Sequence, residues 1–442
     1  MVCARLPAVP RRPRKPAQDR TSVELFAGGG GLAMAVHNAG FRPLLLNEFA
    51  KHACDTLLAN DMELRGEEER IPGPEDPWLV VPGDVQELKM GYLHGKVDII
   101  AGGPPCQPFS LGGVAKGDED RRNMFPQMFR AVREIQPKAV ICENVRGLLR
   151  PSFRPYFDYI LRELSLPFKE RDPASTWLEH DAVLKGIDED SVDPQMRYEV
   201  VMTQVNAADY GVPQIRNRVI IVAFRADLGV DLDAFRKAVR PTHSEAALIH
   251  SMHSGEYWAR HPEVPDHVRQ RAMNRYTQVP LANDGLLPWR TLRDAVMGVD
   301  GNEPLQPITW DRLDRREYFP EGPITDHIGW PDARIYPGHT PNELDRPAKT
   351  VKAGVHGVPG GESVMLTDDL LDEAASLEDR VYRHRYMTVR ETARVMTFPD
   401  SWKLSGPRGE KMRQLGNAVP VRLGEVFAKA VARSLDEVAN GS

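Results

Sequence analysis

Short apolar runs alternate with amphipathic stretches over the first half of the chain. Strand-length apolar runs lie at 22–26, 43–47, 79–81, 97–101, 139–143, 198–205 and 219–224, and stretches with helical spacing lie at 32–39, 49–60 and 125–135. Strands that alternate with helices predict an α/β fold built on a doubly wound, mostly parallel sheet. Because ligands bind at the carboxyl ends of the strands in such sheets, we expect a site in the loops that follow them.

The same pattern divides the chain into parts. A polar, acidic stretch at 167–197 is interpreted as an insertion or a long loop. Regular spacing is lost over 241–345 and returns at 346. We therefore expect a main domain made from 21–240 and 346–442, with a second, smaller domain inserted at 241–345.

The composition of the 442-residue chain, 41% hydrophobic and 27% charged, is typical of a globular protein with two or three folded units. No apolar run approaches the roughly 20 residues that span a bilayer, and no signal-peptide pattern follows the basic N-terminus. Both observations predict a cytoplasmic protein with no membrane partner. The net charge of −6 argues weakly against nucleic acid. A local basic surface still binds DNA, because screening limits the reach of distant charges to about 10 Å.

Three local biases add to this picture. Residues 1–20 combine arginines with prolines and predict a disordered basic tail, either solvated or in contact with DNA phosphates. Residues 241–345 hold ten arginines and no lysine, which suits bidentate contacts to guanine but also fits an arginine-rich source proteome. The four cysteines form no Cys-x-x-Cys pair, so the sequence predicts neither a disulfide framework nor a metal site.

A glycine loop follows the first predicted strand. Gly28-x-Gly30-x-x-Ala33 fits the dinucleotide fingerprint, and Glu48 lies 20 residues beyond Gly28. Glycines let a ligand approach the backbone, and the carboxylate suits ribose hydroxyls, so the loop predicts a cofactor that contains adenosine. Asp84, after the third strand, is placed to accept from an adenine amino group. A tight turn without a ligand is the alternative for both features.

Candidate chemistry follows the next strands. Cys106 lies in a stiff loop, Gly102-Gly-Pro-Pro-Cys106-Gln-Pro-Phe-Ser110, where a nucleophile is well held, whereas Cys142 within a strand is expected to be buried and inert. Glu143 ends the following apolar run, and its alternative role is that of a capping or surface acid. Gln214-x-Arg216-x-Arg218 alternates along an extended segment, so its three side chains are expected on one face, as a site or as a solvated strand edge.

Together these motifs resemble those of C5 cytosine-specific DNA methyltransferases of the bacterial restriction-modification type. The motifs, in the order of that family, are Phe26-Ala-Gly-x-Gly-Gly, Pro105-Cys106-Gln107, Glu143-Asn144-Val145, Gln214-x-Arg216-x-Arg218 and Gly416-Asn417-x-Val419-Pro420. The resemblance covers about 21–225 and 345–435, and it implies a class I S-adenosylmethionine-dependent methyltransferase fold. Residues 241–345 match the family only in position, as the inserted target-recognition domain.

The resemblance also implies a role for each residue of the site. S-adenosylmethionine, or the product S-adenosylhomocysteine, would be held by Phe26, Gly28, Gly30, Glu48, Phe49, Asp84, Val85, Met124, Asn417 and Val419. Phe26 would lie near the methionine part, Glu48 on the ribose and Phe49 against the adenine. Many relatives carry tryptophan at the position of Phe49, so its stacking is expected to be weaker.

The expected chemistry needs no metal. The Cys106 thiolate adds to C6 of cytosine and makes C5 nucleophilic, a protonated Glu143 donates to N3, and Arg218, with Arg216, holds O2. The base must leave the duplex, and the segment 107–125 is expected to close over it. The expected partner is double-stranded DNA, with a companion restriction endonuclease that acts on the same site without a stable complex.

Three other functions stay open at this point. An RNA cytosine-5 methyltransferase of the same family is the first, although the long 241–345 segment favours DNA. A nicotinamide-dependent dehydrogenase fits the glycine loop but leaves Cys106, Glu143 and Arg218 without a role. A non-catalytic DNA-binding homologue is the third, and the presence of every expected catalytic residue argues against it.

Overall fold

The computed structural model describes residues 20–66, 68–105, 123–277, 285–298, 302–313, 324–353, 363–373 and 381–441. Three predictions therefore fall on parts that it does not describe. The predicted basic tail lies outside the described residues except for Arg20, Cys106 lies outside them, and so does the segment 107–125 that is expected to close over the base, except for its last three residues.

The larger lobe contains an eight-stranded sheet in the order β3-β4-β2-β1-β5-β6-β8-β7. Its strands are β1 (Arg20–Leu25), β2 (Phe41–Glu48), β3 (Glu63–Leu64), β4 (Leu79–Pro82), β5 (Ile99–Gly102), β6 (Ala139–Val145), β7 (Tyr198–Asn206) and β8 (Asn217–Arg225). Neighbouring strands from β3 to β6 are parallel, whereas β8 runs antiparallel to both β6 and β7. The predicted mostly parallel sheet is confirmed.

Burial on both faces explains why the central strands read as continuous apolar runs. In β6, every residue from Ala139 to Asn144 is buried. The strand is longer than expected and ends at Val145. Glu143 therefore lies inside the strand, paired with Ile220 of β8. The carboxylate is therefore fixed by the sheet and not carried on a loop.

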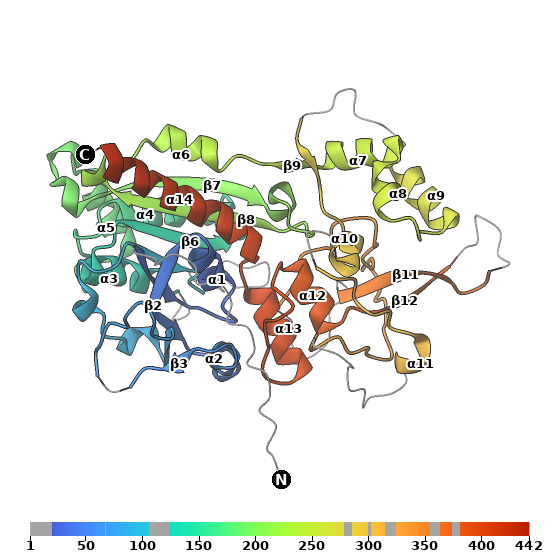
Figure 1. Ribbon diagram of the computed structural model, residues 1–442. Helices are drawn as coiled ribbons and strands as arrows, with labels where there is room; N and C mark the ends of the chain where they lie inside the picture. The colour runs from blue at the N-terminus through green and yellow to red at the C-terminus, as the bar shows by residue number, and fades with distance from the viewer. Residues whose placement is uncertain are drawn as a thin grey trace, which may run out of the picture.

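Helices cover both faces of the sheet (Figure 1). One face packs on α3 (Phe125–Ile135) and α4 (Arg154–Ser165), and the other on α1 (Gly31–Asn38), α6 (Leu232–Ala238) and the long C-terminal α14 (Val421–Gly441). The helix α2 (Lys51–Leu58) packs beside β2 and β4. A Cβ on Gly424 of α14 would lie 2.7 Å from the Cβ of Ala35 in α1. Glycine at this position therefore lets α1 and α14 cross closely.

The polar stretch at 167–197 contains a helix, α5 (Trp177–Lys185), and two short 3-10 turns at Glu189–Ser191 and Pro194–Met196. The sequence pattern did not reveal this helix because apolar residues lie on its exposed side and polar residues on its buried side. Leu178 and Val183 are 60% exposed, whereas His180 and Asp181 are buried. A capping box between Thr176 and Glu179 starts the helix.

The smaller lobe lies beside the carboxyl ends of the sheet strands (Figure 1). It contains α7 (Glu245–Ser254), α8 (Glu256–Arg260), α9 (Asp266–Arg275), α10 (Leu292–Met297), α11 (Trp310–Leu313), α12 (Val389–Val395), α13 (Arg408–Asn417) and the hairpin of β11 (Val364–Leu370) and β12 (Tyr382–Tyr386). A short parallel pair, β9 (His243–Ser244) with β10 (Leu287–Pro288), links it to the sheet lobe. Elements from both sides of residue 345 thus share this lobe, and the chain returns to the sheet with α14. The domain limits at 240 and 345 stay predictions.

A buried ionic cluster holds the smaller lobe together. Both nitrogens of the Arg293 fork contact Asp345, at 2.6 and 2.9 Å, and the guanidinium also bonds Asp368 of β11 at 2.7 and 2.8 Å. The buried hydroxyl of Tyr257 donates to Asp345 at 2.8 Å. Bidentate pairing of this kind satisfies buried charges, so α8, α10 and β11 are locked to one another.

None of the helices described is both long and apolar enough to cross a membrane.

Candidate active site

The register of three neighbouring strands, β1, β5 and β6, brings residues of three sequence motifs side by side. Gly102 at the end of β5 pairs with Leu25 of β1 on one side and with Cys142 of β6 on the other. Phe26, Gly103 and Glu143 directly follow Leu25, Gly102 and Cys142 in the sequence. The register therefore places the starts of three sequence motifs at one edge of the sheet.

The glycine loop is anchored to the end of β2 by Glu48. One carboxylate oxygen accepts from the amide of Gly28 at 2.7 Å, and the other accepts from the amide of Ala50 at 2.7 Å. Phe26 has a φ of 58° and Gly28 a φ of 54°. Left-handed backbone is uncommon for a residue such as Phe26 and costs on the order of 1 kcal/mol or more, which is typical of a site where the backbone is shaped for a ligand.

Two glycines beside this loop leave room for a ligand, and two others do not. No heavy atom lies within 4 Å of the Cβ that Gly28 or Gly83 would carry. In contrast, a Cβ on Gly30 would lie 2.8 Å from the Trp402 ring, and one on Gly31 would lie 2.5 Å from the Val419 carbonyl oxygen. Gly28 and Gly83 thus border an open cradle, whereas Gly30 and Gly31 are required by close packing of the C-terminal segment.

The structure describes every other residue that was predicted to hold the cofactor. Phe49 is 77% exposed directly after β2 and offers a free aromatic face. Asp84 accepts from the amide of Gln86 at 2.9 Å, so it also caps the 3-10 turn that Val85 begins. Phe26, Val85 and Met124 pack on the same hydrophobic cluster, Asn417 is exposed at the end of α13, and Val419 is buried. The open cradle and exposed aromatic fit the adenosine part of S-adenosylmethionine.

Glu143 and Arg218 form an ion pair at the carboxyl end of β6. The Nε of Arg218 lies 2.7 Å from Oε1 of Glu143, and the two side chains are only 12% and 10% exposed. The antiparallel pairing of β6 with β8 produces this contact, because Val145 lies opposite Arg218. A buried carboxylate and guanidinium are thereby held at one point with their charges matched.

The chain that leads to Cys106 passes beside this pair. Asn144 donates from its side-chain amide to the carbonyl of Pro104 at 3.0 Å. A Cβ on Gly103 would lie 3.8 Å from Oε2 of Glu143. The contact of Asn144 with Pro104 was not expected from the sequence, because nothing in either motif indicates its partner. The distance from the Cys106 thiol to Glu143 and Arg218 stays a prediction.

Arg216 faces a different environment from Arg218. Its side chain is 1% exposed and donates to three backbone carbonyls, those of Val351 at 3.0 Å and of Gly416 and Ala418 at 2.9 Å each. Burial, with a smaller contribution from Arg218, lowers the pKa of Arg216 to about 9. The structure thus places Arg216 on the C-terminal segment and Arg218 on Glu143, although both belong to one motif.

Gln214 also bonds to the C-terminal part of the chain. Its side-chain oxygen, Oε1, accepts from the backbone amide of Val351 at 3.2 Å, and the residue forms a β-bridge with Ala348. Gln214 and Arg216 therefore join residues 348–351 to the entrance of β8. That all three side chains of the motif share one face stays a prediction.

The two described cysteines, Cys54 and Cys142, are unsuited to catalysis. Burial raises the pKa of the Cys142 thiol to about 12. Burial, together with Glu48 and Asp55, raises the pKa of the Cys54 thiol to about 11. The predicted burial of Cys142 within a strand is confirmed. Over the described parts of the chain, no three His, Cys, Asp or Glu side chains gather as they would to hold a metal ion.

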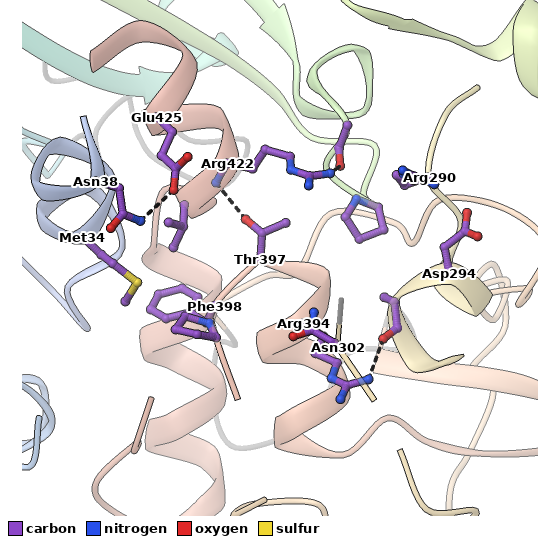
Figure 2. Close-up of a pocket in the computed structure, with 15 residues that line it drawn as sticks. Met34, Asn38, Arg290, Asp294, Asn302, Arg394, Thr397, Phe398, Arg422 and Glu425 are labelled. Carbon is purple, nitrogen blue, oxygen red and sulfur yellow. Dashed lines mark hydrogen bonds between the residues drawn. The ribbon is translucent and has the colours of Figure 1, made fainter. Parts of the chain in front are cut away.

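A cavity of about 320 Å³ lies away from this site, where the two lobes meet (Figure 2). It is bordered by α1 and α14 on one side and by α10 and α12 on the other. Arg422 donates to the Gly211 carbonyl at 3.0 Å, and Arg394 forms a bidentate pair with Asp400 at 2.9 and 2.6 Å. Because these guanidiniums bind protein groups and no predicted site residue lines the cavity, we interpret it as a gap at the lobe junction.

Comparisons with known proteins agree with this geometry. A family model described as C-5 cytosine-specific DNA methylase matches residues 20–166 and 194–433. The Type II methyltransferase M.PspPI of a Psychrobacter species is 30% identical over 435 residues, which cover 96% of this chain and 81% of that protein. The Type II methyltransferase M.Eco47II of Escherichia coli is 30% identical over 433 residues, with coverage of 95% and 80%.

Solved structures support the fold. A crystal structure of an E. coli prophage protein described as a DNA modification methyltransferase has a TM-score of 0.53 at 18% identity and covers 94% of this chain and 99% of that one. The crystal structure of the Dnmt2 methyltransferase of S. pombe has a TM-score of 0.50 at 14% identity, with coverage of 95% and 99%. With the sheet order, the glycine loop on Glu48 and the pair of Glu143 with Arg218, the chain belongs to the C5 cytosine-specific DNA methylase family and is a DNA cytosine-5 methyltransferase.

Proposed function

We propose that this enzyme transfers the methyl group of S-adenosylmethionine to C5 of a cytosine that is flipped out of a specific duplex DNA sequence. The observation that supports this most is the buried pair of Glu143 and Arg218 at 2.7 Å, beside the chain that leads to Cys106. A pyrimidine needs an acid at N3 and a cation at O2, and this pair offers both at one point.

The proposed reaction begins at Cys106. Its thiolate forms a bond to C6 of the base, and the electron pair of the C5–C6 double bond then attacks the methyl carbon from C5. Loss of the C5 proton to a base and departure of the Cys106 thiolate restore the double bond. The products are 5-methylcytosine, S-adenosylhomocysteine and one proton.

Glu143 and Arg218 would exchange partners when the base arrives. Without a base, the two side chains neutralise each other. In the complex, Glu143 would hold N3 as a proton donor, and Arg218 would hold O2 and the charge that develops there. The carbonyl of Pro104 already accepts from Asn144, so the Pro105 carbonyl is the better acceptor for the exocyclic amine.

We propose that Arg216 positions the site and does not touch the base. Three of its N–H groups, one on Nη1 and two on Nη2, already donate to the carbonyls of Val351, Gly416 and Ala418. It would thereby hold Asn417, which lies between two of these residues, beside the cofactor cradle. This role replaces the O2 contact that the motif alone suggested.

S-adenosylmethionine supplies an electrophilic methyl group on a sulfonium. The residues that would hold it are the glycine backbone from Phe26 to Gly28, Glu48 for the ribose, and Phe49 and Asp84 for the adenine. The open space at Gly28 and Gly83 supports this assignment. Val85, Met124, Asn417 and Val419 would complete the walls.

The proposed partner is double-stranded DNA, read by side chains between 241 and 345. Relatives named Type II methyltransferases support a place in a restriction-modification system. A companion endonuclease would then act on the same sequence without binding this enzyme.

A covalent trap tests the mechanism. With DNA that carries 5-fluorocytosine at the target, the fluorine at C5 blocks the proton loss, so the enzyme stays joined to DNA through Cys106. Bisulfite sequencing of a plasmid propagated with the gene first identifies that target. We expect a denaturation-resistant complex for wild type and for Cys142→Ala, and none for Cys106→Ala, which still binds cofactor. Absence of a complex with methylatable DNA would overturn the mechanism, and methylation of tRNA in place of duplex DNA would overturn the substrate.

A further inference from the structure

A segment outside the family match packs against the catalytic lobe. The family model leaves residues 167–193 unmatched, and α5 lies in this segment. It packs on α4, the helix that follows the Glu143 motif along the chain. On the polar side, Asp181 contacts Arg162 of α4 and Lys185, each at 2.6 Å. The inserted helix is therefore firmly attached to α4 by charge as well as by packing.

An aromatic cluster forms the contact between the two helices. Trp177 at the start of α5 lies edge-on to Tyr156 of α4, with ring centroids 5.1 Å apart, and contacts Tyr159 at 5.6 Å. His180 of α5 lies 5.8 Å from the Tyr159 ring. Tyr156 and Tyr159 are both buried. Edge-to-face packing of this kind fixes ring orientation as well as position.

The two tyrosine hydroxyls in this cluster have different partners. The Tyr159 hydroxyl bonds Nδ1 of His180 at 3.0 Å, and Nε2 of that ring bonds the Lys169 carbonyl at 2.8 Å. Burial lowers the pKa of His180, which favours the neutral ring. Because the carbonyl only accepts, Nε2 carries the proton of the neutral ring. Tyr159 also bonds Glu163 on its own helix, so the partners described for its hydroxyl lie on α4 and α5.

The Tyr156 hydroxyl binds a residue outside the cluster, just before the start of α3. It accepts from the side-chain amide of Asn123 at 2.5 Å. The other end of this buried side chain, Oδ1, accepts from the Phe125 amide at 3.3 Å. Both ends of the Asn123 side chain are thus held, one by α3 and one by α4. Met124, the next residue, is the N-cap of α3 and supplies no side-chain cap of its own.

We propose that Tyr156, held in place by Trp177 of the inserted helix, is a positioning residue for methyl transfer. It fixes Asn123 and hence the backbone of Met124, where the chain arrives from the Cys106 motif and enters α3. The inference rests on the proposed function, which assigns Met124 to the cofactor cradle. The inserted segment 167–193 thereby stabilises the cofactor side of the active site without touching substrate.

The chain contains a matched control for this proposal. Tyr156 and Tyr159 are one helical turn apart, both buried and both in contact with Trp177. Each of the two substitutions removes one buried hydroxyl, with its hydrogen bonds, from the same cluster. Only Tyr156→Phe also frees Asn123. An effect that arises from weaker packing of α4 on α5 would appear in both variants, whereas an effect through Asn123 would appear in one.

The first experiment compares Tyr156→Phe with Tyr159→Phe. We expect Tyr156→Phe to raise the Kd for S-adenosylhomocysteine, measured by calorimetry, and the KM for S-adenosylmethionine by about fivefold, the scale of one lost hydrogen bond. Tyr159→Phe should leave both within about twofold of wild type, with thermal unfolding affected as much as in Tyr156→Phe. Equal changes of Kd in the two variants, or none in Tyr156→Phe, would overturn the proposal.

A second experiment tests the route through Asn123 and Trp177. In an Asn123→Ala background, Tyr156→Phe should have no further effect on the Kd, because the partner of the hydroxyl is gone. Trp177→Ala should raise the Kd, whereas Leu178→Ala on the exposed side of α5 should not. Additive effects of Asn123→Ala and Tyr156→Phe would contradict the route. A wild-type enzyme that neither binds S-adenosylhomocysteine nor transfers methyl would refute the proposed function itself. An active wild-type enzyme whose variants show an unchanged Kd would refute only the positioning role of Tyr156.

Discussion

At the scale of single residues, two arginines of one motif have different partners because their surroundings differ. Arg216 and Arg218 alternate along the chain, yet one is fully buried on backbone carbonyls and the other pairs with a carboxylate. The family resemblance implied that Glu143 and Arg218 act on the same base, and the structure pairs the two side chains. The sequence did not predict the partners of Arg216, because Gly416 and Ala418 lie 200 and 202 residues further along.

The two arginines should therefore fail in different ways. Arg216→Met leaves three buried carbonyls without donors, and we expect it to lower the free energy of unfolding by about 2–4 kcal/mol, measured with urea. Arg218→Met should keep most of the stability but lower kcat by about 100-fold or more, because the charge at O2 is lost. A stable but inactive Arg216→Met would contradict the positioning role.

Thiol reactivity gives a second test at this scale. Raised pKa values leave Cys142, near 12, and Cys54, near 11, almost wholly protonated at pH 8, and both are buried. Because the thiolate is the reactive form, we expect iodoacetamide to spare both residues in the native enzyme and to modify them after denaturation. Peptide mass spectrometry measures the extent at each site. Rapid native labelling of Cys142 would show that β6 opens readily.

At the scale of helices and strands, burial decides what the sequence reveals. The strands were predictable because both faces of β5 and β6 are covered and only apolar residues fit there. The helix α5 was not, because its buried positions are filled by His180 and Asp181, whose partners Tyr159 and Arg162 lie on another helix. Tertiary partners determine those two positions, and a pattern along one segment cannot contain that information.

Helix packing yields a prediction at the same scale. We expect Gly424→Ala to lower the free energy of unfolding by about 1–3 kcal/mol, because the new methyl group would press on Ala35 and push α14 from α1. Gly409→Ala is the control, since its Cβ would meet no heavy atom within 4 Å and α13 gains helix propensity there. We expect it to be neutral or slightly stabilising. Equal destabilisation by the two changes would mean that the α1–α14 contact is looser than described.

At the scale of the whole molecule, the cofactor cradle belongs to both halves of the chain. Trp402 donates from its indole to the Gly29 carbonyl at 3.1 Å, and the Val419 carbonyl lies against Gly31. The glycine loop was predictable because its fingerprint is local. These C-terminal contacts were not, because a tryptophan 373 residues away carries no sign of its partner.

Cofactor binding should therefore protect segments that are far apart in sequence. We expect S-adenosylhomocysteine to slow amide hydrogen exchange at 26–31 and also at 398–402 and 416–421, because ordering the glycine loop orders what packs on it. The helix α6, on the outer face of the sheet, should exchange at an unchanged rate. Protection confined to 26–31 would indicate that the two halves move independently.

The three carbonyls that hold Arg216 have a consequence for protein synthesis. Two of them belong to Gly416 and Ala418, and α14 follows them to the last described residue. A ribosome that has made the first 225 residues has produced all the described strands of the large sheet, but one face of that sheet still lacks two of its three helices, α6 and α14. Because the carbonyl partners of Arg216 at Gly416 and Ala418 do not exist before those residues have been made, the nascent enzyme stays inactive until then. In a cell newly acquiring the gene, the delay before its DNA is first marked would include this maturation time.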